Sequence, residues 1–171
     1  GSYAFSAPDH AAVCWCAPCR ARCHGFEQDS GIGESISDLY FNFINHLAWR
    51  VNEAFPDKRL VTLAYATRVW PPEGLDRPWN TNTLIQIAQL RVSAVRSIGE
   101  SSDVFAMRRA RTLAAWARLA PQLLIYDYDP HADLSRMPYW RSRAIAQEMR
   151  SYRGYGVIGF TTEGYHAFLR S

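Results

Sequence analysis

The sequence predicts an α/β fold of parallel β/α units that forms part of a (β/α)8 barrel of the TIM type, with about five strands present. Short apolar segments typical of buried strands alternate with longer segments whose apolar residues recur at helical spacing. The strand-like segments end in carboxylates, amides or aromatic residues, and parallel barrels gather functional side chains at the carboxyl ends of their strands. With 171 residues, the chain is short for a complete barrel, which needs about 250.

The first expected strand is Phe5–Asp9, and a cysteine-rich loop follows it. A helix is predicted over Glu34–Phe55, because apolar residues recur there every four positions and indicate one buried stripe. The members of this stripe are Leu39, Phe43, Leu47, Val51 and Phe55. Pro56 and Asp57 end the helix, and the strand Leu60–Tyr65 follows at the spacing of an α-to-β connection.

The segment Trp70–Trp79 is rich in proline and is expected to form a long irregular loop. The strand Leu84–Gln89 comes next, and after a polar stretch a helix is predicted over Val104–Leu119, closed by Pro121. The side of this helix expected to be buried carries Leu113, Trp116 and Ala120. The solvated side is expected to carry Arg108, Arg109 and Arg111.

The last third of the chain predicts the strand Gln122–Tyr126, a loop, the helix Pro138–Tyr152 and the strand Val157–Thr161. This order suits a single domain, residues 1–171, of parallel strands joined by right-handed crossovers. A doubly wound open sheet would give a similar order. No strand, however, is followed by a glycine-rich phosphate-binding loop, which favours the partial barrel.

The composition narrows the classes of partner. Hydrophobic residues make up 48% of the chain, enough for a core. The net charge of +3 comes from scattered arginines, since Lys58 is the only lysine, and no nucleic-acid-binding module is recognisable. No apolar run approaches the about 20 residues that a membrane-spanning helix needs. We therefore expect neither a nucleic-acid partner nor a membrane partner.

Three carboxylates follow strand-like segments and are the candidate catalytic residues, namely Asp9, Asp127 and Glu163. Partial burial at a barrel mouth can raise a carboxyl pKa toward the range of a general acid. The alternatives are a turn cap for Asp9, a loop-ordering role for Asp127 and an exposed acid for Glu163. The β-pleat directs Asp127 to one side of the sheet and its two neighbours, both tyrosines, to the other, so only one of these sets can face the mouth.

Five residues are candidates for substrate binding, namely Tyr65, Trp70, Gln86, Tyr126 and Tyr128. Aromatic rings can stack on the apolar face of a ligand, and an amide can form hydrogen bonds with its hydroxyl groups. For Tyr65 and Gln86 the alternative is a packing role. Trp70 lies in the proline-rich loop, where a tryptophan can also form the core of the loop itself.

Four cysteines fall within ten residues, namely Cys14, Cys16, Cys19 and Cys23. Four thiolates could hold a structural zinc ion, although such sites usually draw two ligands from each of two separated segments. Disulfides in a secreted protein and free thiols are the alternatives. No cofactor is expected to be required for activity.

Several short motifs in a fixed order carry a resemblance to a known family. They are Ser6–Asp9, Cys14–Cys19, Tyr40–Asn45, Thr62–Tyr65, Pro71-Pro72, Tyr126–Tyr128, Gly156–Phe160 and Glu163-Gly164. With them the chain resembles the bacterial family named domain of unknown function 4838, which is similar to glycoside hydrolase family 163, a family of endo-β-N-acetylglucosaminidases acting on complex N-glycans. The resemblance implies the C-terminal half of a barrel, whose partners are a carbohydrate substrate and the missing barrel half or other segments of the parent chain.

The resemblance also implies a mechanism. The expected enzyme is a glycoside hydrolase that cleaves β-linked N-acetylglucosamine glycans with retention, through attack by the substrate's own 2-acetamido group. Such an enzyme would be secreted or periplasmic. The alternative is a non-catalytic glycan-binding or interaction module on a degenerate barrel, which Pro8 favours because it stands where a polar neighbour of Asp9 is expected. A zinc-stabilised interaction domain around the cysteine loop is a third hypothesis.

Overall fold

The computed structural model describes residues 1–7, 14–23, 35–89, 96–98, 100, 102–129 and 142–164. The strands are β1 (Ser2–Ala4), β2 (Arg59–Tyr65), β3 (Thr83–Ala88), β4 (Leu123–Asp129) and β5 (Val157–Gly164). The helices are α1 (Ala17–Arg20), α2 (Ser37–Ala54), the 3-10 turn η1 (Ala66–Arg68), α3 (Val104–Leu119) and α4 (Ser142–Gly154).

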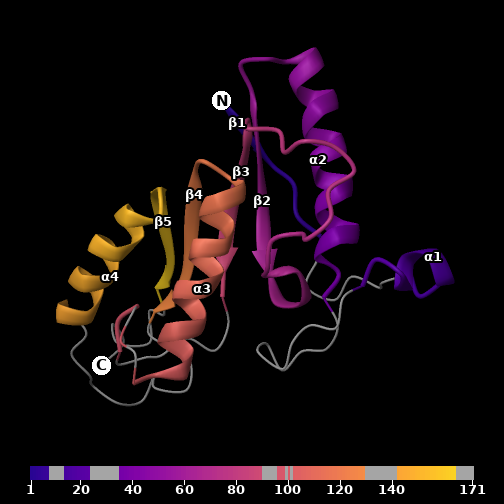
Figure 1. Ribbon diagram of the computed structural model, residues 1–171. Coiled ribbons are helices and arrows are strands. Elements are labelled where there is room, and N and C mark those ends of the chain that lie inside the picture. Colours follow the sequence, from indigo (N-terminus) through magenta and orange to yellow (C-terminus); the bar gives the residue numbers. More distant parts are fainter. Residues whose placement is uncertain are drawn as a thin grey trace, which may run out of the picture.

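All five strands are parallel and lie in the order in which they occur along the chain, β1-β2-β3-β4-β5. The sheet curls into a half-barrel, with α2, α3 and α4 on its outer side (Figure 1). A doubly wound sheet would reverse its strand order at a switch point, and this sheet has no reversal. The predicted partial barrel of parallel β/α units is therefore confirmed.

One connection between adjacent strands lacks a long helix. Residues 66–82, which we name the β2–β3 crossover, contain only η1 and otherwise run irregularly along α2. The predicted irregular loop Trp70–Trp79 is the central part of this crossover. Because an irregular segment packed against a helix must find partners for those backbone polar groups that the packing buries, the neighbouring helix has to supply them.

The hydrophobic core lies between the outer side of the sheet and the helices. Trp116 of α3 is fully buried at its centre, 4.8 Å from Phe41 of α2 and 6.3 Å from Trp79 of the β2–β3 crossover, measured between ring centroids. The Trp116 indole N–H donates to the carbonyl oxygen of Val69 at 2.7 Å. One aromatic side chain thus joins two helices and the crossover. Leu113 and Ala120 are buried with Trp116, as predicted.

The predicted apolar stripe of α2 is wrong. Phe43 and Phe55 are exposed, at 55% and 57%, and the other three members are only half-buried. The buried residues of α2 are Ser37, Asp38, Phe41, Ile44, Asn45 and Ala48. The helix packs on the sheet through its apolar residues and on the β2–β3 crossover through polar ones, so a count of apolar residues alone selects the wrong face.

Two further predictions need correction. The first strand is Ser2–Ala4, because pairing with β2 already begins at Ser2, opposite Arg59. Residues 5–7 of the predicted strand Phe5–Asp9 follow it without strand structure, and residues 8 and 9 lie outside the described residues. The residues of β1 are exposed, as an edge strand allows, and carry little apolar signal. Arg109 is buried within α3 rather than solvated.

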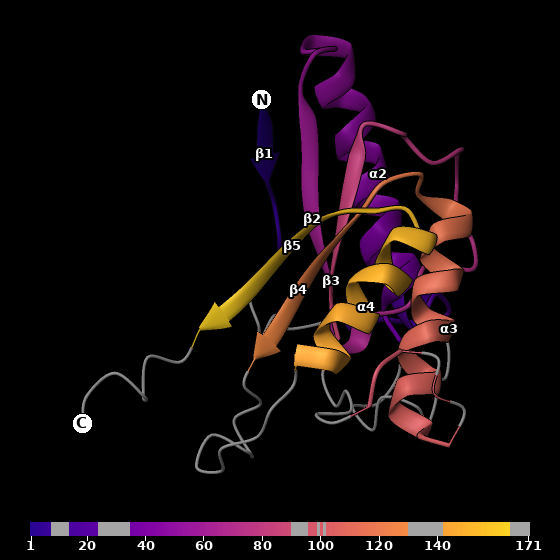
Figure 2. The same cartoon turned by 90° about the vertical axis from the view of Figure 1, so that its left-hand side faces the viewer.

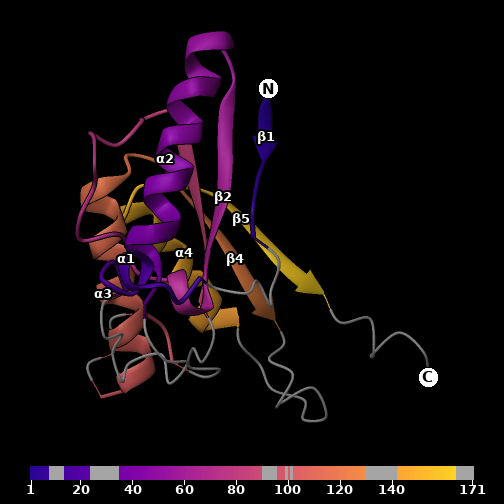
Figure 3. The same cartoon turned by 90° about the vertical axis from the view of Figure 1, so that its right-hand side faces the viewer.

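Figures 2 and 3 show that the long helices all lie on one side of the sheet. The opposite side, the inner face, carries none of the described helices. The two outermost strands, β1 and β5, each pair with one strand in the described part of the chain. None of the described helices combines the length and the apolar character that crossing a membrane requires.

Candidate functional site

The inner face of the sheet is defined by the alternation of side chains along each strand. On β2, Leu60 and Ala64 belong to the outer core, and Thr62 shares a hydrogen bond of 2.8 Å with Tyr40 of α2. The intervening residues of β2 therefore lie on the inner face, and the same alternation holds along β3 and β4. The inner-face residues of these three strands are Val61, Leu63, Tyr65, Leu84, Gln86, Ala88, Leu124, Tyr126 and Tyr128.

Register arranges the inner face in rows, because paired residues on parallel strands share a face. One row runs across four strands and comprises Leu63, Gln86, Leu124 and Gly159. Closer to the carboxyl ends, Tyr65 pairs with Ala88, and Tyr126 pairs with Thr161. The floor of the face is largely apolar, while its carboxyl end is aromatic and polar. This is the end at which parallel barrels carry their chemistry.

The clearest feature of this end is a pair of tyrosines on β4. The rings of Tyr126 and Tyr128 lie 5.3 Å apart between centroids at an interplanar angle of 69°, and both side chains are half-buried. Glu163 of β5 takes the register position beside Tyr128. The structure therefore brings three of the predicted site residues to adjoining positions on two neighbouring strands.

Gly159 keeps this part of the inner face open to the side chain of Leu124. A Cβ at Gly159 would lie 2.7 Å from Leu124 Cδ2, closer than carbon atoms approach one another. The absent side chain lets Leu124 lie across β5, directly below the row that carries Tyr126. The glycine is thus required by a close approach within the site's floor.

Asp127, between the two tyrosines, lies on the other side of the sheet. Its side chain is nearly fully buried, and Oδ2 is 3.2 Å from Arg109 Nη2 on α3. Asp127 Oδ1 accepts a hydrogen bond of 3.0 Å from the backbone N–H of Tyr128. Both carboxylate oxygens are therefore engaged, on the side that faces the helices. Of the two sets that the pleat separates, the tyrosines occupy the inner face.

Arg109 joins two carboxylates from two elements. Its Nη1 lies 3.5 Å from Glu148 Oε1 of α4, and Nη2 donates a hydrogen bond to the hydroxyl of Tyr152. Burial acts against the cation, but the charges of Tyr152, Asp127 and Glu148 outweigh it and hold the pKa of Arg109 above its ordinary value. This buried cluster ties β4 to α3 and α4 behind the inner face.

Sequence reasoning missed this cluster, although helical spacing contained the signal. Arg109 stands three residues after Ala106 and four before Leu113, both of which are buried. It therefore belongs to the apolar side of α3. An arginine inside such a stripe needs buried partners of opposite charge, and a carboxylate on a neighbouring strand is one such partner.

The remaining predicted site residues are distributed as follows. Tyr65 and Gln86 are half-buried on the inner face. Trp70 packs against the outer core, and its carbonyl oxygen accepts a hydrogen bond of 2.8 Å from Ser37 Oγ, so it is not brought to the tyrosines. Asp9 lies outside the described residues, and for Glu163 only the strand position is described.

Comparison with known proteins assigns the chain to a family. Over residues 2–169 it matches the family described as Domain of unknown function (DUF4838). The chain belongs to this family. No curated protein and no solved structure matches it.

The DUF4838 chain carries a cluster of thiols on the segment that contains α1. The Sγ atoms of Cys14, Cys16 and Cys19 all lie within 4.8 Å of one another, and none of the four cysteines, Cys23 included, forms a disulfide. The three clustered thiols could bind a metal such as zinc. The arrangement matches the predicted cluster in three of its four members.

Hydrogen bonding separates two of these thiols chemically. The backbone N–H of Cys19, followed by the thiols of Cys14 and Cys19, stabilises the Cys16 thiolate and lowers the pKa of Cys16 below its ordinary value. Hydrogen bonds to Cys16 and then Cys14 raise the pKa of Cys19 to about 11. Cys16 is therefore the thiol most readily ionised of this pair.

A second feature of the DUF4838 chain that sequence reasoning missed is a polar stripe on α2. It consists of Asp38, Asn42, Asn45 and Trp49, at helical spacing. The Asp38 carboxylate accepts hydrogen bonds from the backbone N–H groups of Glu73 and Gly74 at 2.7 and 2.9 Å. Gly74 suits this close approach, because a Cβ there would lie 3.0 Å from Asp38 Oδ2 and would push that oxygen away by a few tenths of an ångström.

The stripe supplies the partners that the irregular β2–β3 crossover needs. Asn45 Nδ2 donates to the carbonyl oxygens of Arg77 and Pro78 at 3.2 and 3.1 Å, and Asn45 Oδ1 accepts from the Asn80 N–H at 2.8 Å. The Trp49 indole donates to the Pro78 carbonyl oxygen at 3.1 Å. The polar side of α2 thus supplies hydrogen-bond partners to the crossover backbone, which a helix would supply from its own backbone.

Proposed function

We propose that the inner face binds carbohydrate and that the chain is part of a glycoside hydrolase acting on β-linked N-acetylglucosamine glycans, with retention through the substrate's 2-acetamido group. The observation that carries the proposal is the Tyr126–Tyr128 pair on the inner face, at the carboxyl end of a parallel strand. Sugar sites combine aromatic platforms with a few polar groups that fix orientation. Tyr65, Gln86 and Thr161 supply such groups in neighbouring rows.

The proposed chemistry is an acyl-assisted displacement. The acetamido oxygen of the substrate attacks the anomeric carbon while the glycosidic C–O bond breaks, and a protein carboxyl group donates its proton to the leaving oxygen. A second protein group orients the acetamide, and water then opens the cyclic intermediate. Asp9 is the proposed general acid and Glu163 the proposed orienting group.

Asp127 receives a different role in this proposal. Its two carboxylate oxygens are occupied by Arg109 and by the Tyr128 N–H, on the helix side of the sheet. Direct contact with a substrate on the inner face would require that ion pair to break. We therefore propose that Asp127 acts by holding β4, and with it the two tyrosines, in position.

The experiment is a hydrolysis and binding assay of the parent polypeptide that contains this chain, with β-N-acetylglucosaminides and complex N-glycans. The protein is expected to release product, Asp9→Asn is expected to release none, and Tyr126→Ala is expected to bind about tenfold more weakly. Tyr126→Phe is the matched control, because it keeps the ring and removes only the hydroxyl. Absence of both binding and product in the unmodified protein would overturn the proposal.

A second candidate function is a glycan-binding module without catalysis. The ion pair between Asp127 and Arg109 favours this second function. Of the three candidate catalytic carboxylates, Asp127 is the one whose side-chain contacts are described, and these contacts are structural. Glycan binding at micromolar concentration without product from the unmodified protein would decide for this function. Retained binding in Asp9→Asn would then follow as well.

We further propose that additional β/α units of the parent polypeptide complete the inner face. Both outermost strands of the described sheet pair on one side only, and unpaired strand edges favour association. Analytical ultracentrifugation of the chain alone is expected to show self-association. A monodisperse monomer across a wide concentration range would contradict this proposal.

A further inference from the structure

The segment of residues 14–23 is held with very little packing. Its helix, α1, has only four residues, and none of the residues of the segment is buried. A single helical turn is far too short to be stable by itself in water. A segment without a core of its own needs a cross-link or a bound ion to keep one conformation.

The thiols of this segment converge on one point. Cys14, Cys16 and Cys19 bring their Sγ atoms within 4.8 Å of one another. In a tetrahedral zinc site with Zn–S bonds of about 2.3 Å, the sulfur atoms lie about 3.8 Å apart. A contraction of about 1 Å at most therefore brings the three sulfur atoms to ligand spacing.

Cys23 is the candidate fourth ligand, and its Sγ lies outside the group formed by the three other sulfur atoms. It follows Cys19 by four residues, and its Sγ donates a hydrogen bond of 3.4 Å to the Cys19 carbonyl oxygen. The thiol thus already lies against the residue that carries one of the three clustered sulfur atoms. Exchange of this weak hydrogen bond for a metal bond would complete a four-thiolate set.

Three converging thiols fit a metal better than a disulfide. One disulfide joins two of these sulfur atoms and leaves the third unused beside it, whereas one ion uses all three. Arg20 follows the cluster and is exposed, and its charge suits the negative charge of a metal with four thiolate ligands. We propose that Cys14, Cys16, Cys19 and Cys23 bind one Zn²⁺ ion that fixes the α1 segment against the β2–β3 crossover.

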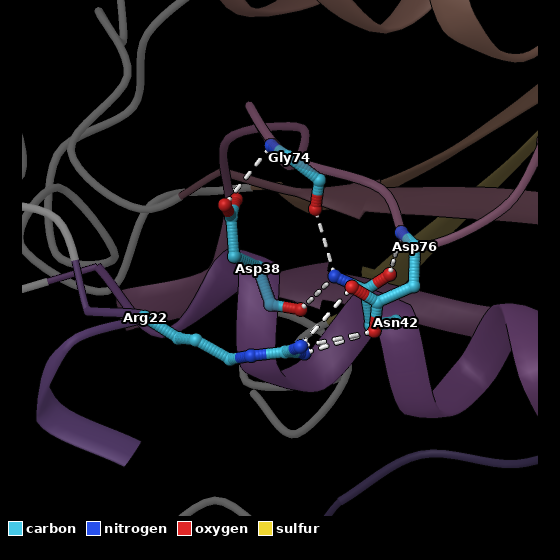
Figure 4. A network of polar contacts seen from close by, with 5 residues as sticks. All are labelled: Arg22, Asp38, Asn42, Gly74 and Asp76. Carbon is cyan, nitrogen blue, oxygen red and sulfur yellow. Dashed lines mark hydrogen bonds and ion pairs between the residues drawn. The ribbon is translucent and has the colours of Figure 1, made fainter. Parts of the chain in front are cut away.

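The route from the ion to the crossover passes through Arg22. Its guanidinium forms a bidentate ion pair with Asp76 of the crossover, with Nη1–Oδ2 and Nη2–Oδ1 distances of 3.1 and 3.0 Å. The backbone N–H of Asp76 donates to Asn42 Oδ1 at 2.7 Å, and Asn42 Nδ2 donates to the Gly74 carbonyl oxygen at 2.7 Å (Figure 4). Figure 4 shows these residues around the first turns of α2.

The ion and the pair depend on each other in this arrangement. Both side chains of the Arg22–Asp76 pair are largely exposed, and such pairs contribute little when their side chains are free to move. Zn²⁺ would order the segment that carries Arg22 and would so remove most of the conformational entropy that the ion pair loses when it forms. The proposed site is therefore a structural clasp on the β2–β3 crossover, and it does not depend on the proposed glycan chemistry.

The metal is tested first, with Zn²⁺ and with Co²⁺ as a coloured substitute. The full chain, purified under reducing conditions, is expected to retain about one metal ion per chain after dialysis and to show the visible bands of tetrahedral thiolate-bound Co²⁺. Cys16→Ser and Cys19→Ser are expected to lose both. Trp15→Phe is the matched control, because it changes an exposed residue between two ligands without removing a thiol. The proposal is overturned if the reduced chain retains no metal. It is also overturned if the cysteines of the chain, isolated without reductant, are found in a disulfide and hold no metal.

The clasp is tested by amide hydrogen exchange at residues 73–76. A chelator is expected to speed exchange there by about tenfold or more, and Arg22→Gln with metal bound is expected to reproduce the effect. The stability of the rest of the fold is measured separately, because thermal unfolding of Cys16→Ser shows whether a metal-free chain still folds. Unchanged exchange on metal removal in a folded, metal-binding chain overturns the clasp.

Discussion

Arg109 of α3 and Asp127 of β4 form an ion pair of 3.2 Å in which both residues are at least 95% buried. Glu148 of α4 approaches the same guanidinium to 3.5 Å, so one cation serves two buried carboxylates. The cluster joins three elements at the strand that presents the tyrosine pair. Its main consequence is that the position of the candidate site depends on charges that no substrate touches.

Replacement of Arg109 should destabilise the fold strongly. Arg109→Gln leaves two carboxylates buried without their cation, and removal of one partner from such a cluster costs about 3–5 kcal/mol. Urea unfolding followed by circular dichroism measures this cost. Arg111→Gln, on the exposed side of the same helix, should change the free energy of unfolding by no more than about 0.5 kcal/mol. Equal effects of the two substitutions would mean that the cluster is not energetically special.

Asp127 and Glu163 should respond to substitution in opposite ways. Asp127→Asn weakens the ion pair with Arg109 and is expected to lower the free energy of unfolding by about 2–4 kcal/mol while retaining some hydrolysis. Glu163→Gln is expected to leave stability within about 0.5 kcal/mol and to abolish hydrolysis. Paired unfolding and N-glycan hydrolysis assays measure both properties. If Asp127→Asn is stable but inactive, Asp127 takes part in the reaction directly and its role is not only structural.

Asn45 should be among the most sensitive polar residues of α2. It is fully buried and bonds three backbone groups of the β2–β3 crossover. Asn45→Ala leaves these groups without a side-chain partner and should lower the free energy of unfolding by about 2–4 kcal/mol. His46→Ala, at the exposed next position, is the control and should be nearly neutral. The idea fails if chemical denaturation gives both variants the same midpoint.

The two thiols of opposite pKa shift should differ in reactivity. In the metal-free, reduced chain the lowered pKa of Cys16 makes its thiolate available at lower pH than that of Cys19, whose pKa is raised to about 11. Limited alkylation at neutral pH, followed by peptide mass spectrometry, should therefore label Cys16 before Cys19. Raising the pH toward 11 should reduce the difference. Preferential labelling of Cys19 at neutral pH would contradict the hydrogen-bond arrangement of the cluster.

Metal affinity should depend on pH in the same direction. Zn²⁺ displaces the thiol protons on binding, so the apparent affinity should rise with pH across the range in which Cys19 holds its proton. Competition with a chelator of known affinity measures this slope. A pH-independent affinity would exclude Cys19 as a ligand.

The sequence predicted the parallel β/α units and four of the five strands to within two or three residues, because long apolar periodicities dominate those elements. The helix Val104–Leu119 was predicted with its observed bounds. The α2 stripe could not be predicted in this way. Asp38 and Asn45 are buried by hydrogen bonds to a crossover that adjoins them only in the folded chain. Apolar spacing carries no information about such partners.

The site was predicted to a smaller extent. The pleat argument separated Asp127 from Tyr126 and Tyr128 correctly, but the sequence alone could not decide which set lies on the inner face. That decision depends on Arg109, whose neighbours in the chain suggested a solvated arginine cluster. A buried arginine in an apolar stripe and a carboxylate at a strand end each look unremarkable until the register brings them together.

In the described sheet, strands that follow one another in the sequence are also neighbours in space. Each strand pairs only with the strand before and after it, as in a short linear array of repeats, and no pairing joins the two ends. Loss of β1, whose residues are exposed, breaks one strand pairing, whereas opening at β3 breaks two. Local unfolding should therefore proceed inward from the edges, with β3 as the slowest part to open. Closure of the ring would remove both edges, and with them the places where local unfolding starts.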